Sequence, residues 1–172
     1  MSSETTSATA TGVLFVHSCP KALAPHVEWA LAREIGRTVK LEWTPQPLMP
    51  GFVRATANWR GPVGTAPAVA SSLFGWQQLR FEITENASRI GDGGRWMHTP
   101  SLGIFHMQTD RAGNGVLTEH AIHAAIIGAA GDSDVLAREL RLALGQSWDE
   151  ELEPFRGAEP GDAIVVPLHR VG

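Results

Sequence analysis

The sequence is poor in cysteine and lysine, contains no tyrosine, and has no long hydrophobic run. Cys19 is the only cysteine, so no disulfide can form within the chain, which favours a reducing compartment. The only lysines are Lys21 and Lys40, and no Lys/Arg cluster occurs. Because phosphate neutralisation requires a basic surface, we expect no nucleic-acid partner. No segment approaches the roughly 18 apolar residues that a membrane-spanning helix needs, so we expect no membrane span.

The length and charge of the chain favour one globular domain. Its 172 residues suit a single unit, with 14 Lys and Arg against 18 Asp and Glu and a net charge of −4. Residues 1–11 are rich in Ser, Thr and Ala and lack the basic start and apolar core of a secretory signal, so we predict a disordered tail and a cytoplasmic location. Residues 12–172 then form the domain, in two halves, 12–84 and 85–172.

The first half has the hydrophobic spacing of six alternating elements. Leu23, Val27, Leu31 and Ile35 recur at every fourth position, as on one face of a helix, whereas the strand candidates show apolar runs or alternation. The predicted order is β-α-β-β-α-β, that of a ferredoxin-like split β-α-β core with an antiparallel sheet and its helices on one face. The predicted elements are strand Gly12–Ser18, helix Leu23–Ile35, strand Thr38–Thr44, strand Phe52–Arg60, a helix capped by Thr65 and ending near Phe74 or Trp76, and strand Gln78–Thr84.

The second half predicts an extension of this α+β core. Strands are expected over Arg95–His98 and Leu102–Thr109, followed by a hairpin turn over Asp110–Gly115. Thr118 is expected to cap a helix with isoleucines on one face. A long helix should start at Ser133, because Leu136, Leu140, Leu144, Trp148 and Leu152 repeat every fourth residue. The predicted extension is therefore a β-hairpin, two helices and a final strand, Ala163–Leu168.

One segment combines a charge, an indole and a titratable ring. Arg95, Trp96 and His98 lie within four consecutive residues, directly after Gly93 and Gly94, and His106 on the following strand is expected nearby. Such a group can bind an acyl or phosphate group, or a protein partner. The alternative is that Trp96 pins the segment onto the core while Arg95 faces water.

A second candidate is the turn that contains Gly61, Gly64 and Thr65. Backbone N–H groups at the start of a helix can cradle an anion. The turn lacks the Gly-Lys-Ser/Thr ending of a phosphate-binding P-loop, and a tight turn that leads into a capped helix explains it equally well.

The remaining polar clusters favour structural roles. Cys19 lies near His17 and His26 and could act as a nucleophile or zinc ligand, but a buried thiol is the simpler interpretation. The acidic residues of the segment 148–153 are typical of a solvated helix face rather than a cation site. We therefore expect no metal and no cofactor. Trp43 and Trp59 are expected to pack between the sheet and the helices.

Several longer motifs resemble one known family, the actinobacterial domain of unknown function 3145 family. The resemblance implies an intracellular protein and carries no activity, cofactor or catalytic residue. It also implies a link to acyl-chain metabolism, because members are often encoded near genes of type II fatty-acid synthesis. The motifs that carry it are Val16-His17-Ser18 with Pro20, Pro25-His26-Val27-Glu28-Trp29, Gly61-Pro62-Val63-Gly64-Thr65, Asp92 to Pro100, Leu102-Gly103-Ile104-Phe105, Arg138 to Gln146, and Glu151 to Arg156.

These observations predict a non-catalytic binding or regulatory protein that acts through a protein partner, with a link to fatty-acid or acyl metabolism. The alternative is a small-ligand or acyl-group binding protein, or a weak enzyme, with its site around Arg95, Trp96, His98 and His106. A thiol enzyme that uses Cys19 is a third hypothesis. The sequence leaves open whether copies of the chain associate with one another.

Overall fold

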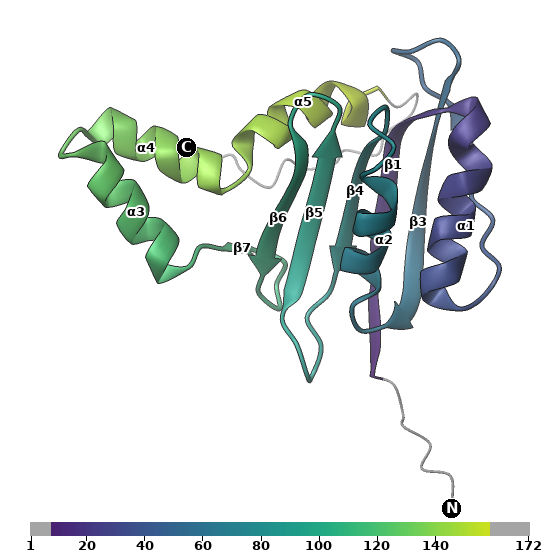
Figure 1. The fold of residues 1–172 in the computed structure, drawn as a ribbon, viewed down its shortest axis with the longest axis horizontal. Helices are drawn as coiled ribbons and strands as arrows, with labels where there is room; N and C mark the ends of the chain where they lie inside the picture. The colour runs from purple at the N-terminus through teal and green to yellow at the C-terminus, as the bar shows by residue number, and fades with distance from the viewer. Residues whose placement is uncertain (1–7, 159–172) are drawn as a thin grey trace, which may run out of the picture.

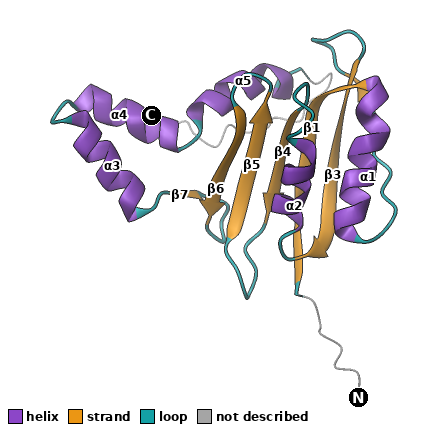
Figure 2. Ribbon diagram, in the orientation of Figure 1, coloured by secondary structure: helices purple, strands orange, loops and turns teal. Residues whose placement is uncertain are grey.

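The computed structural model describes residues 8–158, which form a mixed α+β structure around one antiparallel sheet (Figures 1 and 2). The sheet has seven strands in the order β2-β3-β1-β4-β5-β6-β7. Its elements along the chain are β1 (Thr9–Pro20), a short 3-10 turn (Lys21–Leu23), α1 (Ala24–Ile35), β2 (Thr44–Pro45), β3 (Phe52–Pro62), α2 (Thr65–Leu73), β4 (Arg80–Glu85), β5 (Gly93–Thr99), β6 (Gly103–Thr109), β7 (Gly115–Val116), α3 (Glu119–Ala129), α4 (Ser133–Ala143) and α5 (Gln146–Arg156).

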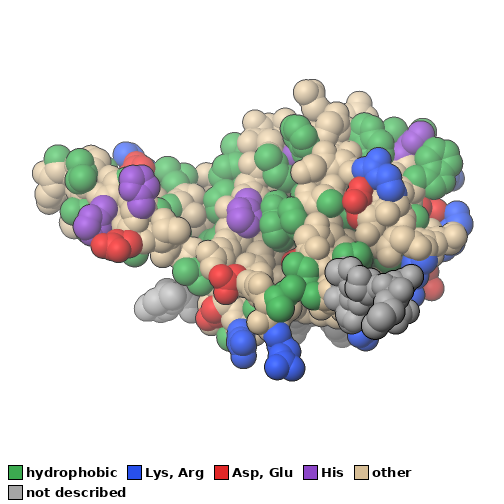
Figure 3. Space-filling view, turned by 60° about the horizontal axis from the view of Figure 1, so that its bottom comes forward, with side chains coloured by type: hydrophobic (Ala, Val, Ile, Leu, Met, Phe, Trp, Pro, Cys, Tyr) green, Lys and Arg blue, Asp and Glu red, His purple; other side chains and the backbone are tan. Residues whose placement is uncertain are grey.

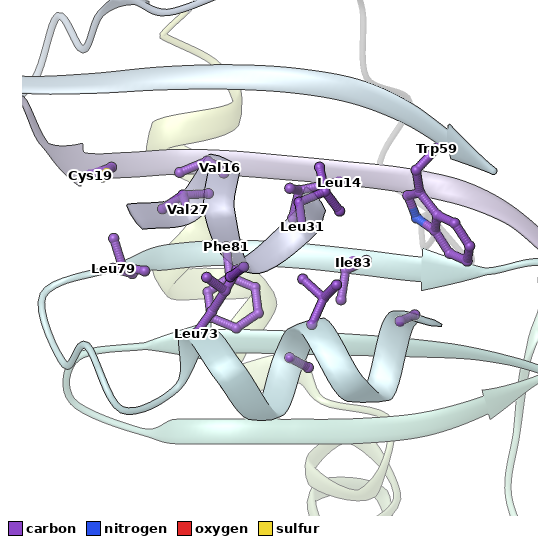
Figure 4. Packing of buried hydrophobic residues seen from close by; sticks show 14 of the residues in the cluster. Leu14, Val16, Cys19, Val27, Leu31, Trp59, Leu73, Leu79, Phe81 and Ile83 are labelled. Carbon is purple, nitrogen blue, oxygen red and sulfur yellow. The ribbon is translucent and has the colours of Figure 1, made fainter. Parts of the chain in front are cut away.

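The main hydrophobic core lies between the sheet and the helices α1 and α2 (Figure 4). Strand alternation places Leu14 of β1 and Phe81 of β4 on this face, where both are fully buried. Leu31 of α1 packs against them, since its helix presents an apolar residue on this side every turn. Each such side chain contributes roughly 1.5–3 kcal/mol when it is fully buried. Trp59 is also buried here and Trp43 is partly buried, which confirms their predicted packing.

The opposite face of the sheet is covered by α5, whose Leu152 is fully buried. The pair α3 and α4 packs mainly against itself and extends away from the sheet beyond β7 (Figure 1). Among residues 8–158, each helix is either too short or too polar to cross a membrane.

The predicted strand Thr38–Thr44 is wrong, because only Thr44–Pro45 forms a strand. The buried carboxylate of Glu28, on α1, accepts hydrogen bonds from the Leu41 backbone N–H at 3.0 Å and from the Trp43 indole at 3.1 Å. A backbone donor that a strand would use is therefore taken by a side chain. The alternation that predicted a strand reflects side chains that pack on the core from an irregular segment.

Replacing Glu28 with alanine is expected to lower the free energy of unfolding by about 1–3 kcal/mol, because two partly buried donors, the Leu41 N–H and the Trp43 indole, lose a charged acceptor. Glu42 lies in the same stretch but is exposed, so Glu42→Ala should change stability by less than about 0.5 kcal/mol. Urea denaturation of both variants measures the difference. Equal stabilities would show that Glu28 does not hold this segment.

The long helix predicted in the C-terminal half is interrupted at one glycine. The long helix expected from Ser133 is two helices, α4 and α5, which meet at Gly145 with φ +85°. A Cβ at Gly145 would lie 2.7 Å from the Phe105 ring, so glycine is needed both for the backbone angle and for the close approach. The extension therefore contains three helices instead of two.

Other predicted boundaries were partly correct. The hairpin turn is confirmed, since β6 pairs with β7, and the Thr118 hydroxyl accepts a bond from Ala121 N–H as the cap of α3. Thr65 is not a cap; Gly64, with φ +92°, precedes α2. β1 starts at Thr9, inside the stretch predicted as a tail. Residues 1–7 and the predicted strand Ala163–Leu168 lie outside the described residues.

Candidate functional site

The predicted site residues divide between the two faces of the sheet. Arg95, Trp96 and His98 belong to β5, which confirms the strand expected over Arg95–His98 and extends it to Gly93–Thr99. Successive strand residues point to opposite faces, so Arg95 faces α5 while Trp96 and His98 face the α2 side. His106 of β6 pairs with Trp96. The structure therefore brings Trp96 and His106 together and places Arg95 in a different environment.

Trp96 and His106 form a stacked pair on the α2 side of the sheet. Their ring centroids lie 4.6 Å apart with an interplanar angle of 19°. A Cβ at Gly94 would lie 2.4 Å from the indole, so this glycine makes room for Trp96. Partial burial lowers the pKa of His106, which favours a neutral imidazole. Figure 3 shows a histidine beside hydrophobic side chains near the middle of this face. The pair offers a flat apolar surface with one titratable group.

His98 has a structural environment instead. It is buried, its Nδ1–H donates to the Leu79 carbonyl at 2.8 Å, and its ring stacks on Phe81. Burial lowers its pKa despite this hydrogen bond. A ligand on the surface would not reach this ring.

Arg95 takes part in a buried ionic network under α5. It donates to Glu82 Oε2 at 2.7 Å and to Asp149 Oδ1 at 2.6 Å. Arg156 of α5 donates to Glu82 Oε1 at 2.7 Å and to Asp149 Oδ1 at 2.8 Å. His17 Nε2 also donates to Glu82 at 2.7 Å. Two carboxylates thus bind two guanidinium groups and one imidazole across β1, β4, β5 and α5.

The electrostatics of this network favour its charged form. Burial alone would raise the pKa of Glu82, but the hydrogen bond from His17 and the charges of His17, Arg156 and Arg95 outweigh it and hold that pKa well below its ordinary range. Burial would lower the pKa of Arg156, yet the charge of Glu82 raises it overall. Because these groups already bind one another, the network fastens α5 to the sheet and offers no open position for a substrate.

Sequence reasoning missed this network, although part of its signal was present. Glu82 alternates with the apolar residues Phe81 and Ile83 in a buried strand, which indicates a carboxylate directed to the second face of the sheet. Asp149 and Arg156 lie seven residues apart, or two helical turns, on a helix whose acidic residues we interpreted as solvated. Only the structure shows that α5 crosses Glu82.

The turn with Gly61, Gly64 and Thr65 already binds an anion of the chain itself. The Glu85 carboxylate accepts hydrogen bonds from the backbone N–H of Gly64 at 2.8 Å and of Ala66 at 3.0 Å. Thr65 Oγ1 donates to the Pro62 carbonyl at 2.7 Å. An external phosphate would have to displace Glu85 to use these donors, so the geometry favours a capped helix.

Cys19 lacks the environment of a nucleophile. It is fully buried, and burial raises the pKa of its thiol from 9.0 to about 12. The nearby His17 donates to Glu82. Within residues 8–158, no three His, Cys, Asp or Glu side chains are grouped so that they could hold a metal ion.

We expect Cys19 to resist thiol reagents in the folded protein. A rise of the pKa from 9.0 to about 12 lowers the thiolate fraction at neutral pH roughly a thousandfold, and burial restricts access further. Absorbance with 5,5′-dithiobis(2-nitrobenzoate) should report reaction only in denaturant. Rapid labelling of the native protein would restore the thiol-enzyme hypothesis.

The structure also shows an aromatic groove that the sequence did not predict. It lies between α1 and α2, has a volume of about 320 Å³, and includes His26, Trp29 and Trp76 in its lining. Trp29 is 63% exposed, and its ring meets His26 edge-on at 4.9 Å. Arg33 borders the groove and donates to Ser72 across the two helices.

Helix α3 packs on α4 but leaves much of its apolar surface exposed. Residues 121–131 contain no Asp, Glu, Lys or Arg. Ala125 and Ala129 are buried, whereas Ile126 is 51% and Ile127 78% exposed. A helix that is apolar on every side is normally buried on every side. The isoleucines that we expected on one face therefore lie largely in solvent, on a helix pair that stands off the sheet.

Comparison with protein families supplies the identification. The model described as "Protein of unknown function (DUF3145)" matches residues 13–170. The chain belongs to the DUF3145 family. This match confirms the resemblance drawn from the sequence motifs. No curated protein and no solved structure matches the chain. The DUF3145 match includes the ionic network, the Trp96–His106 pair and α3, so all three features lie within the matched region.

Proposed function

We propose that this DUF3145 protein is a non-catalytic binding protein that recognises a protein partner through α3. The observation that carries the proposal is the exposure of Ile126 and Ile127 on a helix without charged residues between positions 121 and 131. Burial of such side chains releases about 25 cal/mol per Å² of apolar surface. A contiguous apolar surface of this kind is typical of an interaction site.

The chemistry of α3 defines the partner surface. Because this stretch carries no Asp, Glu, Lys or Arg, the partner's contact surface should be apolar and uncharged, for example the apolar face of a helix. Isoleucines at positions 122, 126 and 127 would supply the anchors of such an interface. The two histidines of α3, His120 and His123, are exposed and would lie at its margin.

The rest of the fold supports α3 as a rigid platform. α3 packs on α4, and α4 joins α5 at Gly145, which lies against Phe105 and Met97. α5 is in turn fastened to the sheet by the network of Glu82, Arg95 and Arg156. A pre-formed surface loses less conformational entropy on binding than a mobile one.

A pull-down from lysate of the native host, with quantitative mass spectrometry, tests the proposal. We expect a stoichiometric partner that is captured by the wild type and by Ile90→Asp but lost with Ile127→Asp. Ile90 is a matched control, since it is 68% exposed and lies in a loop between β4 and β5. If Ile127 is a hot spot that contributes about 2 kcal/mol to the binding free energy, its loss corresponds to roughly 30-fold weaker binding. Equal capture by both variants would refute α3 as the binding surface.

A second candidate function rests on the Trp96–His106 pair. The stacked rings, with the 41% exposed Ile104 beside them, suit a flat or acyl ligand. Titration with decanoate should quench tryptophan fluorescence in the wild type and less so in His106→Ala. Tryptophan fluorescence that does not change in the wild type would reject the hypothesis that this pair binds an acyl ligand.

Three finer assignments accompany the proposal. The β-α-β-β-α-β order, with β2-β3-β1-β4 adjacent and α1 and α2 on one face, supports a ferredoxin-like core. The absence of an intrachain disulfide supports a cytoplasmic location. The motif resemblance supports an actinobacterial protein whose partner acts in fatty-acid metabolism, which the identity of the captured protein would test.

A further inference from the structure

Three aromatic rings gather in the groove between α1 and α2. His26 and Trp29 belong to α1, and Trp76 lies shortly after the end of α2. The His26 ring meets the Trp29 ring at 4.9 Å and the Trp76 ring at 5.7 Å, edge-on in both cases, so it links the two indoles. Trp29 is nevertheless 63% exposed, and Trp76 is only partly buried. The hydrophobic core therefore does not use much of the indole surface in this groove.

The groove has one strongly charged residue at its border. Arg33 is the only Lys, Arg, Asp or Glu among the residues that line it. Arg33 forms an ion pair with Glu34, but its side chain is 67% exposed and that of Glu34 only 23%. The charge that this pair presents to solvent is therefore mainly positive. A ligand with a negative charge would complement it.

Neighbouring groups hold the Arg33 guanidinium in one orientation. Its Nε–H donates to Glu34 Oε1 at 2.8 Å, and its Nη2–H donates to Ser72 Oγ at 2.5 Å. The Ser72 hydroxyl in turn donates to the Ala68 carbonyl of α2 at 3.0 Å. Nη1 makes no hydrogen bond to the residues that the structure describes. An anion could accept hydrogen bonds from Nη1 without displacing either partner, and a pre-oriented side chain loses less conformational entropy on binding.

The described chain begins and ends away from the three rings. Ile35, at the far end of α1, lies beside Gly61, which pairs with the start of β1. Nine residues separate Ile35 from His26, which corresponds to about 14 Å along the helix. Residue 158 follows α5, which covers the opposite face of the sheet. Neither described end of the chain therefore lies over the groove.

We propose that the groove between α1 and α2 binds a small planar molecule that carries one anionic group, such as an aromatic carboxylate. The ring stacks on the exposed indole of Trp29, and the anionic oxygens accept hydrogen bonds from Arg33 Nη1. The volume of about 320 Å³ lies at the small end of ligand pockets, which suits one fused ring system and its charged group. The site uses no residue of α3, so it is independent of the proposed partner interface.

Titration of the full-length chain with 2-naphthoate, followed by the ¹H–¹⁵N NMR signals of the tryptophan indoles, tests the proposal. 2-Naphthamide is the matched control ligand, because it keeps the ring and lacks the charge. We expect naphthoate to shift the signals of Trp29 and Trp76 saturably and to leave the other four tryptophans unmoved. Naphthamide should bind roughly tenfold more weakly. No saturation by roughly 5 mM naphthoate, shifts confined to Trp96, or equal affinities for the two compounds would overturn the proposal.

An arginine variant tests the contact with the anionic group. Arg33→Gln should bind naphthoate roughly tenfold more weakly than the wild type and naphthamide equally well. Arg37→Gln is the control, since it removes the same charge just beyond the same helix and Arg37 does not line the groove. Its affinity for naphthoate should stay within about twofold of the wild type. An equal loss of naphthoate affinity in the two variants would contradict a direct contact with Arg33.

A tryptophan variant tests the stacking contact. Trp29→Ala should lose binding of both compounds, whereas Phe74→Ala should bind as the wild type does. Phe74 is a matched control, because it is 50% exposed and does not line the groove. Since Trp29 is 63% exposed, its replacement should leave the fold intact, which an unchanged backbone NMR spectrum verifies. Undiminished naphthoate binding by Trp29→Ala would exclude this groove as the site.

Discussion

Replacing Glu82 with alanine is expected to lower the free energy of unfolding by roughly 3–5 kcal/mol, because two guanidinium groups would lose a buried carboxylate. For a chain of this size such a loss lowers the melting temperature by roughly 6–20 °C. Calorimetry measures it. Glu150→Ala serves as the control, since Glu150 is exposed on α5. A loss no larger than that of the control would mean that the network does not hold α5 to the sheet.

The same carboxylate makes the stability depend on pH. The pKa of Glu82 is held well below its ordinary range in the folded protein, so folding favours the ionised form. Its contribution is fully present above the unfolded pKa of about 4.3 and is lost as the pH falls further. Denaturant midpoints of the wild type should therefore drop more steeply between pH 5 and 3 than those of Glu82→Gln. Parallel pH profiles would contradict a depressed pKa.

Replacing Gly12 with alanine is expected to destabilise the protein by roughly 3 kcal/mol or more. A Cβ at this position would lie 1.8 Å from the Thr84 carbonyl oxygen and 2.7 Å from the Trp59 ring. The backbone of β4 cannot move aside without breaking its pairing with β1 and β5. Gly75→Ala is the control, because its Cβ would meet open space. Urea titrations with equal midpoints for the two variants would show that the strands adjust.

The helices and strands of the core were largely predictable because the spacing of their apolar residues along the sequence matches the repeat of a helix or of a strand. Apolar residues recur at every fourth position from Leu23 to Ile35, and β1 contains an apolar run. Both patterns reflect burial in the core between the sheet and the helices. The same pattern gave a wrong prediction for the segment after α1, where a strand was expected over Thr38–Thr44. There the side chain of Glu28 replaces a neighbouring strand as hydrogen-bond acceptor, and no local pattern distinguishes the two.

The candidate site was predictable only in part, for a similar reason. Local sequence placed Arg95, Trp96 and His98 together, but the site prediction did not apply the alternation of the strand expected there, which separates Arg95 from the other two. Because successive strand residues point to opposite faces, the expected strand already implied opposite orientations for Arg95 and Trp96. The partners of Arg95 lie 13 and 54 residues away, on β4 and α5, so their meeting depends on the tertiary fold.

The ionic network and the exposed helix form one arrangement. Without the network, α5 would keep only contacts such as those of Leu152 and Trp148 with the sheet, so the position of α4 and α3, which follows from α5 through Gly145, would be less fixed. We therefore expect Glu82→Ala to weaken partner binding as well as stability, whereas Ile127→Asp should weaken binding alone. The two variants separate the support of the interface from the interface itself.

Hydrogen exchange of the purified complex, read by mass spectrometry, tests the central claim most directly. α3 packs mainly on α4 in the free protein and leaves its isoleucines in solvent, so its backbone amides should become more protected from exchange when the partner is bound. We predict protection concentrated in residues 119–143. Protection over the α1–α2 groove or the Trp96–His106 pair, with α3 exchanging as in the free chain, would contradict α3 as the binding surface.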